Sequence, residues 1–246
     1  MAKHAVITLC VGNLSYWTVT IPIIRNYSSK IGADFYNITH SKVTKENLHH
    51  PKLEKFQIYE FLNHYDRILY LDSDMVIHPD CPNLFNLVDA NQLGVVCESS
   101  PYFNRDQVFE EACRYGGVSY PGHSNDWFNS GMMVISQTHQ PLFTWPDKIK
   151  SFPARNLDGS IAPPRFRWWD MPYLNSERLR LKFDIHNLGY RYNYLQPLTS
   201  LKNISLRPQE SFIFHGCGED KSGLYQMIET WYSYPVSQLF SVRKDP

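Results

Sequence analysis

Short apolar runs alternate with amphipathic stretches along the chain, and this alternation limits the possible folds more than any other feature. It is typical of repeated strand and helix units, which build a mostly parallel sheet covered by helices. The runs that predict strands are Ala5–Leu9, Asp34–Ile38, Arg67–Leu71, Leu93–Cys97, Met132–Ile135 and Phe212–Phe214. The stretches that predict helices are residues 16–30, 52–65 and 171–182. The expected fold class is therefore α/β, with a mostly parallel central sheet flanked by helices.

The chain has 246 residues, which is enough for one large α/β domain with a substantial core. It shows no internal repeat, low-complexity linker or domain boundary, so we expect a single domain over residues 1–246. Its 24 basic residues balance 24 acidic ones, and no block of like charge occurs. Binding of nucleic acid through a basic surface therefore has no support in the composition.

The first residues pass directly into a strand-like run and do not resemble a signal peptide. No apolar segment approaches the roughly 18 residues that a membrane span needs. The five cysteines are widely spaced and include no C-x-x-C pair, which argues against a disulfide framework or a structural zinc site. These features predict a cytoplasmic protein without a membrane span.

Two carboxylates, Asp72 and Asp74, follow the apolar run that ends at Leu71. Side chains at positions one and three of an extended segment lie on the same face, so both can converge on one cation. Carboxylates this close repel each other unless a cation lies between them, which favours a divalent metal at this strand end. The alternative is a turn that carries two solvated acids.

A second group of polar residues follows the last predicted strand, at His215, Gly218 and Lys221. An imidazole at a sheet edge next to glycines can reach a ligand, and one nitrogen with several oxygens suits Mn²⁺ or Mg²⁺. A lysine after the glycine loop can stabilise negative charge that grows on a phosphate. The alternatives are a hydrogen-bonded structural histidine and an exposed lysine that opens the final helix.

Two segments predict long loops, residues 99–127 and residues 151–167, because both are interrupted by glycine and proline. Asp170 is placed to cap the helix that follows, and Pro172 is tolerated in its first turn. We expect the first of these loops to lie over the functional edge of the sheet.

Four motifs in order make the chain resemble glycosyltransferase family 8, the glycogenin and bacterial galactosyltransferase-like group with the Rossmann-like GT-A fold. The run VITL at residues 6–9, followed by Tyr16, is similar to the family's nucleotide-binding opening, with one extra residue before the tyrosine. YDRILYLDSD at residues 65–74 resembles its DxD strand. DWFNSGMMVI at residues 126–135 resembles its donor-sugar motif, and HGCGEDK at residues 215–221 fits HxxGxxK.

The resemblance implies a metal-dependent transferase that moves a sugar from a UDP-sugar to a hydroxyl acceptor such as a glycan, with retention. It implies three metal ligands, Asp72, Asp74 and His215. For the donor it implies contacts from Thr8, Leu9, Tyr16, Lys55, Ser73, Asn129, Ser130, Gly218 and Lys221. Tyr16 would stack on uracil, and Lys52 replaces Lys55 if the alignment shifts. The implied catalytic residues are Asp170, Lys221 and Asp126.

One position departs from the family pattern. Where the family has an Asp-Gln pair opening a helix near the reactive face of the sugar, this chain has Asp170 and Met171. A thioether cannot hydrogen-bond as an amide does, which leaves the sugar's positioning and the stereochemical course open. If the enzyme is retaining, either Asp170 acts on the sugar or the acceptor attacks from the front face with help from the leaving phosphate. Asp170 as a helix cap alone is the other interpretation.

Two further functions compete with transfer. A phosphatase of the haloacid dehalogenase type also uses an aspartate pair after an apolar strand, but its motif calls for a small residue where Met75 and Val76 stand. A non-catalytic protein that binds sugar nucleotide or glycan would keep the same fold without turnover.

Overall fold

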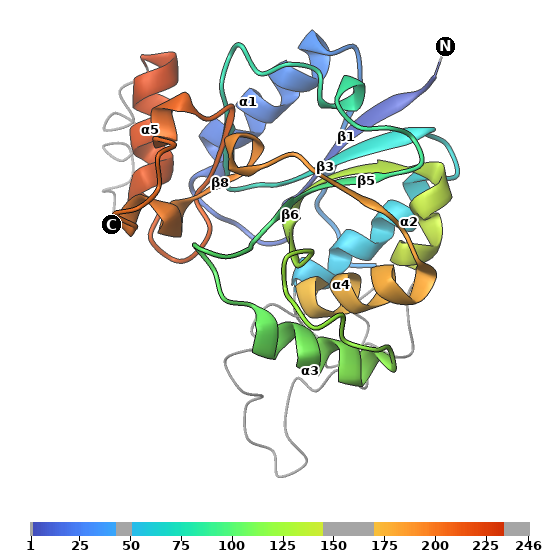
Figure 1. Ribbon diagram of the computed structural model, residues 1–246. Helices are drawn as coiled ribbons and strands as arrows, with labels where there is room; N and C mark the ends of the chain where they lie inside the picture. Colours follow the sequence, from blue (N-terminus) through green and yellow to red (C-terminus); the bar gives the residue numbers. More distant parts are fainter. Residues whose placement is uncertain (1, 43–50, 145–169, 234–246) are drawn as a thin grey trace.

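The computed structural model describes residues 2–42, 51–144 and 170–233 of the chain. Its centre is a six-stranded sheet with the strand order β2-β1-β3-β6-β5-β7. The strands are β1 (His4–Leu9), β2 (Asp34–Ile38), β3 (Arg67–Asp72), β5 (Leu93–Cys97), β6 (Phe128–Ser136) and β7 (Ile185–Asn187). Figure 1 shows helices on both sides of this sheet, as the alternating sequence pattern predicts.

The sheet is mixed in direction. β1 pairs in parallel with β2 and β3, and β5 pairs in parallel with β7, whereas β6 is antiparallel to both β3 and β5. β6 has nine residues and is therefore longer than the predicted run Met132–Ile135, and all nine are buried. Because β6 runs in reverse, Met132 lies opposite Leu71, and the beginning of β6 reaches the edge where β3 ends. This reversal brings the start of β6 next to Asp72.

A small second sheet lies beside that edge, with the order β4-β9-β8. It consists of β4 (Met75–Ile77), β9 (Ile213–His215) and β8 (Tyr194–Leu195). In the antiparallel pair of β4 and β9, His215 lies opposite Met75. Residues far apart in sequence, Asp74 and His215, are thereby held next to each other by backbone pairing.

Buried side chains form separate clusters on the two faces of the central sheet. Along β3, Leu69 and Leu71 belong to one cluster, and Ile68 and Tyr70 belong to the other. This alternation follows the period of two of an extended strand. The helices that cover the faces are α1 (Trp17–Lys30), α2 (Ile58–Phe61), α3 (Asp106–Gly116), α4 (Asp170–Leu181) and α5 (Ser222–Tyr232).

Three expectations about local structure were wrong. The predicted helix over residues 52–65 is a 3₁₀-helix, Pro51–Gln57, followed by the single turn α2. Its apolar residues Leu53 and Phe56 are three apart, a spacing that fits the 3₁₀ period as well as an α-helix. The predicted loop over residues 99–127 contains α3, whose buried face and terminal Gly117 with φ 67° are ordinary helix signals. The loop expected over residues 151–167 lies outside the described residues.

The third error concerns Asp170. It is the first residue of α4, not a residue preceding it, and Pro172 lies in the first turn as expected. Asp170 is buried, and its carboxylate accepts hydrogen bonds from Lys55 and from Ser130 of β6. The position therefore orients a charge toward the sheet edge.

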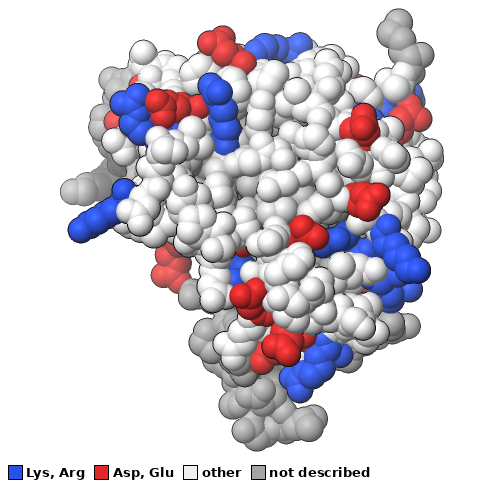
Figure 2. Space-filling view, viewed as in Figure 1, with Lys and Arg blue, Asp and Glu red and all other residues white. Residues whose placement is uncertain are grey.

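On the face seen in Figure 2, positive and negative side chains are interspersed, in keeping with the zero formal net charge. Among the residues that the structure describes, no helix combines the length and the apolar character that a membrane crossing requires.

Candidate active site

A cleft of about 1100 Å³ opens where β3, β6 and β9 end or begin. It collects residues from every motif that the sequence suggested. The predicted site residues that line it are Leu9, Tyr16, Asp72, Ser73, Asp74, Asn129, Ser130, Asp170, His215, Gly218 and Lys221. The three sequence segments around residues 72, 130 and 215 therefore form one site.

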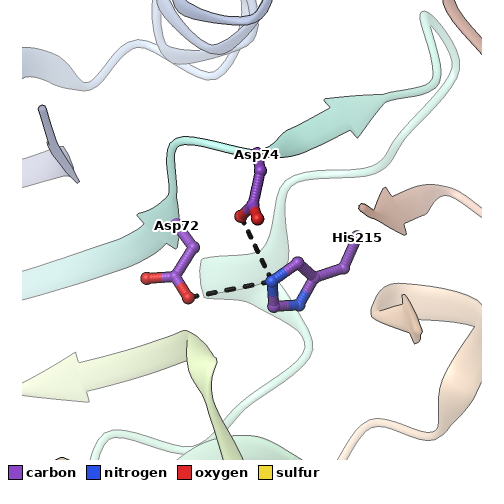
Figure 3. A group of neighbouring side chains, drawn as sticks. All are labelled: Asp72, Asp74 and His215. Atoms are coloured by element: carbon purple, nitrogen blue, oxygen red, sulfur yellow. Dashed lines mark ion pairs between the residues drawn. The ribbon is translucent and has the colours of Figure 1, made fainter. Parts of the chain in front are cut away.

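Asp72, Asp74 and His215 line this cleft, and Figure 3 shows their side chains pointing toward one another. One ligand atom from each residue lies within 4.8 Å of the others. His215 Nε2 is 3.2 Å from Asp74 Oδ1 and 3.7 Å from Asp72 Oδ2. Two carboxylate oxygens and one imidazole nitrogen are donors that suit Mn²⁺ or Mg²⁺.

Gly131 of β6 keeps space open beside these three side chains. A Cβ built at this position would lie 2.5 Å from His215 Cε1 and 2.8 Å from Asp72 Oδ2. Real Cβ atoms do not approach so closely, so the glycine is needed for the three side chains to converge. The donor set and the space around it fit a bound divalent metal.

Lys221 closes one side of this cluster. Its Nζ donates to Asp74 Oδ2 at 2.6 Å and to the Gly216 carbonyl at 2.5 Å, and it lies 5.1 Å from the ring centroid of Tyr16. Burial alone would raise the pKa of Asp74, but the charges of His215 and Lys221 hold that pKa well below its usual range. Asp74 is therefore an anion, which is the form that a metal ligand requires.

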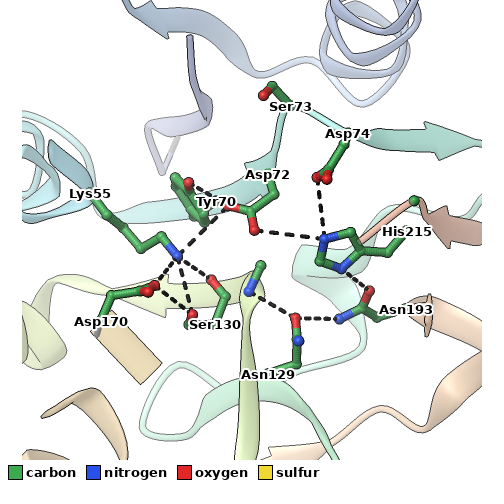
Figure 4. Close-up of polar contacts among 12 residues, drawn as sticks. Lys55, Tyr70, Asp72, Ser73, Asp74, Asn129, Ser130, Asp170, Asn193 and His215 are labelled. Atoms are coloured by element: carbon green, nitrogen blue, oxygen red, sulfur yellow. Dashed lines mark hydrogen bonds and ion pairs between the residues drawn. The ribbon is translucent and has the colours of Figure 1, made fainter. Parts of the chain in front are cut away.

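A second charged group, Lys55 with Asp170 and Ser130, lies on the opposite side of Asp72 from His215 (Figure 4). Lys55 Nζ donates to Asp170 Oδ2 at 2.5 Å and to the Ser130 carbonyl at 2.9 Å, and it is 3.7 Å from Asp72 Oδ1. Ser130 Oγ donates to Asp170 Oδ2 at 2.6 Å. Lys55 thus connects Asp170 to the cluster of Asp72, Asp74 and His215.

Burial and pairing act in opposite directions on both charges of this group. Burial would raise the pKa of Asp170, but Lys55, Lys52 and the hydrogen bond from Ser130 lower it to about 2. Burial would lower the pKa of Lys55, but Asp170 and Asp72 outweigh that effect and raise it. Both groups are therefore charged at neutral pH, which places a fixed carboxylate at the cleft.

The family model of glycosyl transferase family 8 matches residues 11–140, more than half of the chain. The chain belongs to glycosyl transferase family 8. No curated protein is close enough in sequence to count as a match.

Solved structures with a similar fold are also glycosyltransferases. One is a glycosyltransferase involved in glycosylation of the major capsid of PBCV-1, at 15% identity, with 93% of this chain and 99% of that chain covered and a TM-score of 0.55. A second is the galactosyltransferase LgtC in complex with donor and acceptor sugar analogs, at 13% identity, 97% and 100% coverage and a TM-score of 0.53. A third is GlyE of Streptococcus pneumoniae, at 17% identity, 98% and 63% coverage and a TM-score of 0.53. The likeness establishes the GT-A fold of this family 8 glycosyltransferase.

The residues expected to contact the nucleotide separate into two groups. Leu9, Tyr16 and Ser73 line the cleft, and the indole Nε1 of Trp17 donates to Ser73 Oγ at 2.8 Å. Thr8 is fully buried within β1 and does not line the cleft. The structure therefore does not expose Thr8 to the cleft, unlike Leu9, Tyr16 and Ser73.

Asp126 stands apart from the other predicted catalytic residues. Its side chain is 46% exposed, its Oδ2 is 3.9 Å from Arg178 Nη2, and it does not line the cleft. Arg178 belongs to α4, so Asp126 connects the segment before β6 to that helix. The structure brings Asp170 and Lys221 to the cleft but does not bring Asp126 there.

Several residues of this family 8 site were missed by sequence reasoning. Tyr70 donates its hydroxyl proton to Asp72 Oδ1 at 2.7 Å. Glu98 lines the cleft and accepts from Asn129 Nδ2 at 2.7 Å, and Asn193 contacts His215 Nδ1 at 3.1 Å. Glu98 directly follows the strand β5, so its place at a strand end could have marked it as a candidate site residue. Asn193 lies in irregular chain, where no sequence pattern marks it.

Proposed function

We propose that this family 8 glycosyltransferase transfers a sugar from a UDP-sugar to a hydroxyl of a glycan acceptor, with Mn²⁺, or Mg²⁺, as its metal. The observation that carries the proposal is the convergence of Asp72, Asp74 and His215 on one side of a large cleft, with Lys221 beside them. This arrangement supplies oxygen and nitrogen ligands for a cation and a positive charge for a diphosphate in the same place. Asp72, Asp74 and His215 would hold the metal.

The nucleotide would bind on the side of the cleft formed by β1 and α1. Tyr16 offers an aromatic face there, and Gly218, with φ 102°, lets the backbone of the following loop approach the diphosphate closely. When bound, the metal would neutralise charge that develops on the leaving diphosphate. Lys221 would move from Asp74 to that diphosphate and donate its hydrogen bonds there.

The sugar would lie between the diphosphate and Asp170. As the bond from the anomeric carbon to the diphosphate oxygen breaks, positive charge develops on the sugar, and the ionised Asp170 would stabilise it. Asp170 Oδ2 is engaged by Lys55 and Ser130, which makes it a weak nucleophile. We therefore propose retention by front-face attack, in which the acceptor oxygen bonds to the anomeric carbon and its proton passes to the departing diphosphate.

The proposal is tested with a panel of UDP-sugars in the presence of Mn²⁺ and a set of glycan acceptors. We expect release of UDP from at least one donor, transfer when an acceptor is present, and an α-linked product from an α-linked donor. Asp74→Asn removes one ligand charge and should abolish release. Asp80→Asn is the matched control, because the Asp80 side chain is 88% exposed and outside the cleft, and it should keep full activity. Binding of UDP without release from any donor would contradict the proposal.

A further inference from the structure

Glu98 and Asn129 lie at neighbouring strands, and both line the cleft. β5 and β6 pair with Val96 opposite Asn129, and the side chain of Glu98, two residues further on, reaches back to the amide of Asn129. We propose that Glu98 is a positioning residue for the donor sugar, which fixes the Asn129 amide so that it offers the sugar an N–H and not its oxygen. This inference rests on the proposed function, because it takes the cleft to bind a UDP-sugar.

The two ends of the Asn129 amide are distinguished by their partners. The backbone N–H of Gly131 can only donate, and it lies 2.9 Å from Asn129 Oδ1, which is therefore the oxygen. Nδ2 of Asn193, drawn beside Asn129 in Figure 4, donates to the same oxygen at 3.1 Å. At the other end, Asn129 Nδ2 donates one of its two protons to Glu98 Oε1 at 2.7 Å. Among the described residues the other N–H of Asn129 has no partner, so it is left for a ligand in the cleft.

Arg105 holds the carboxylate of Glu98 from the other side. Its Nε donates to Glu98 Oε2 at 2.7 Å, and its guanidinium forms an ion pair with the same oxygen. The guanidinium also lies over the ring of Phe103, 4.9 Å from the centroid. With Oε2 bound to the guanidinium, the carboxylate presents Oε1 to Asn129 as a hydrogen-bond acceptor. An acceptor at this place requires the NH₂ end of the amide, so Glu98 disfavours the reversed amide.

Burial makes the reversed amide costly. Glu98 is 2% exposed and Asn129 is 7% exposed, so water cannot easily replace a lost partner. Reversal would set the amide oxygen against the carboxylate of Glu98, and the NH₂ group against the N–H of Gly131. Mismatched buried pairs of this kind cost more than a hydrogen bond contributes. Asn129 therefore recognises a sugar oxygen that accepts a hydrogen bond, such as a hydroxyl oxygen, a ring oxygen or an amide carbonyl.

The first test needs no ligand. Nitrogen-15 NMR resolves the two Nδ2 protons of Asn129, with the signals assigned by their loss in Asn129→Ala. We expect one proton to be shifted downfield and protected from exchange with water, because it is bonded to Glu98, and the other to exchange rapidly. The downfield shift should disappear in Glu98→Leu. Two equally exchanging protons in the wild-type protein would overturn the proposal even if Glu98→Leu does not fold.

The second test compares the affinities of UDP and of the UDP-sugar that serves as donor, by calorimetry with Mn²⁺ present. UDP has no sugar, so Glu98→Leu should leave its affinity unchanged, whereas the affinity for the UDP-sugar should fall about 3- to 10-fold, as expected for one hydrogen bond. In an Asn129→Ala background Glu98→Leu should not change the ratio of the two affinities further. Glu177→Leu is the matched control, because the Glu177 side chain is 9% exposed and paired with Arg180 but does not line the cleft. It should change neither affinity.

The outcomes separate the possible roles of Glu98. Equal losses for UDP and the UDP-sugar would show that Glu98 only maintains the structure, and a further loss in the Asn129→Ala background would show that it touches the substrate itself. Either result would overturn the positioning role. A wild-type protein that binds no UDP-sugar would instead refute the proposed function, while the orientation of the Asn129 amide would still be decided by NMR.

Discussion

Replacing Lys55 by methionine should lower the free energy of unfolding by several kcal/mol, because it removes the buried cation that pairs with Asp170. The Lys55 and Asp170 side chains are 2% and 3% exposed, and Nζ and Oδ2 are 2.5 Å apart. Methionine fills a similar volume but leaves the carboxylate of Asp170 buried without its cation. The hydrogen bond from Ser130 and the charge of Lys52 remain near that carboxylate, but the paired cation is lost.

The size of the effect follows from the charges. The pKa of Asp170 falls from 3.8 to about 2, which corresponds to about 2 kcal/mol in favour of the ionised form after the cost of burial is included. Without Lys55 the burial cost stays and the largest attraction is lost, so the expected loss is about 3–5 kcal/mol, as for other broken buried pairs. Lys42→Met is the matched control, since Lys42 and Glu60 are 57% and 62% exposed and their pair is worth at most about 1 kcal/mol.

The assay is urea unfolding of Lys55→Met, Asp170→Asn, the double variant and Lys42→Met at neutral pH. The double variant should lose clearly less stability than the sum of the two single variants, because removal of both charges leaves no uncompensated ion. A Lys55→Met variant within about 1 kcal/mol of the wild type, or additive single effects, would refute the view that these two charges depend on each other.

Three other substitutions test separate parts of the structure. Gly131→Ala should weaken Mn²⁺ binding measured by calorimetry, since its Cβ would lie 2.5 Å from His215 Cε1, and unchanged affinity would contradict the fit of the site. Burial lowers the pKa of His139 to about 4 from 6.5, so acid favours the unfolded state, which binds the proton first. Unfolding free energy should fall by up to about 3 kcal/mol as the pH drops from 6.5 to 4, and less in His139→Gln; equal profiles would contradict this. Met171→Gln buries an amide in the apolar cluster with Trp127 and should cost about 1–3 kcal/mol in thermal unfolding, whereas a stabilised variant would show that the cleft supplies a partner.

Strand patterns carried most of the fold prediction. The strands Asp34–Ile38 and Leu93–Cys97 were predicted with their observed bounds. Leu93–Cys97 is a continuous apolar run, which marks a buried strand, whereas Asp34–Ile38 is a largely unburied strand at the edge of the sheet. The direction of β6 was not predictable from its composition, since a strand buried on both faces is apolar whichever way it runs. The direction of β6 nevertheless places Ser130 and Gly131 beside Asp72, so part of the site depends on a strand direction that the sequence does not reveal.

The candidate site was predicted where residues follow strand ends. Asp72, Asp74 and His215 come together because β3 ends at the edge where β4 and β9 pair, and strand ends are visible in the sequence. Asn193 was not predicted, because its role depends on which side chains lie on either side of it in space. The position of Asp126, outside the cleft and near Arg178, was hidden for the same reason.

The most direct test of the central claim is the shift in unfolding free energy produced by UDP and Mn²⁺, alone and together. The account holds that Asp72, Asp74, His215 and Lys221 form one site for a metal diphosphate. Stability should rise by about 2.7 kcal/mol when both ligands are present at a hundredfold excess over their dissociation constant, and much less with either alone. The same stability with UDP and Mn²⁺ together as without them would contradict the account.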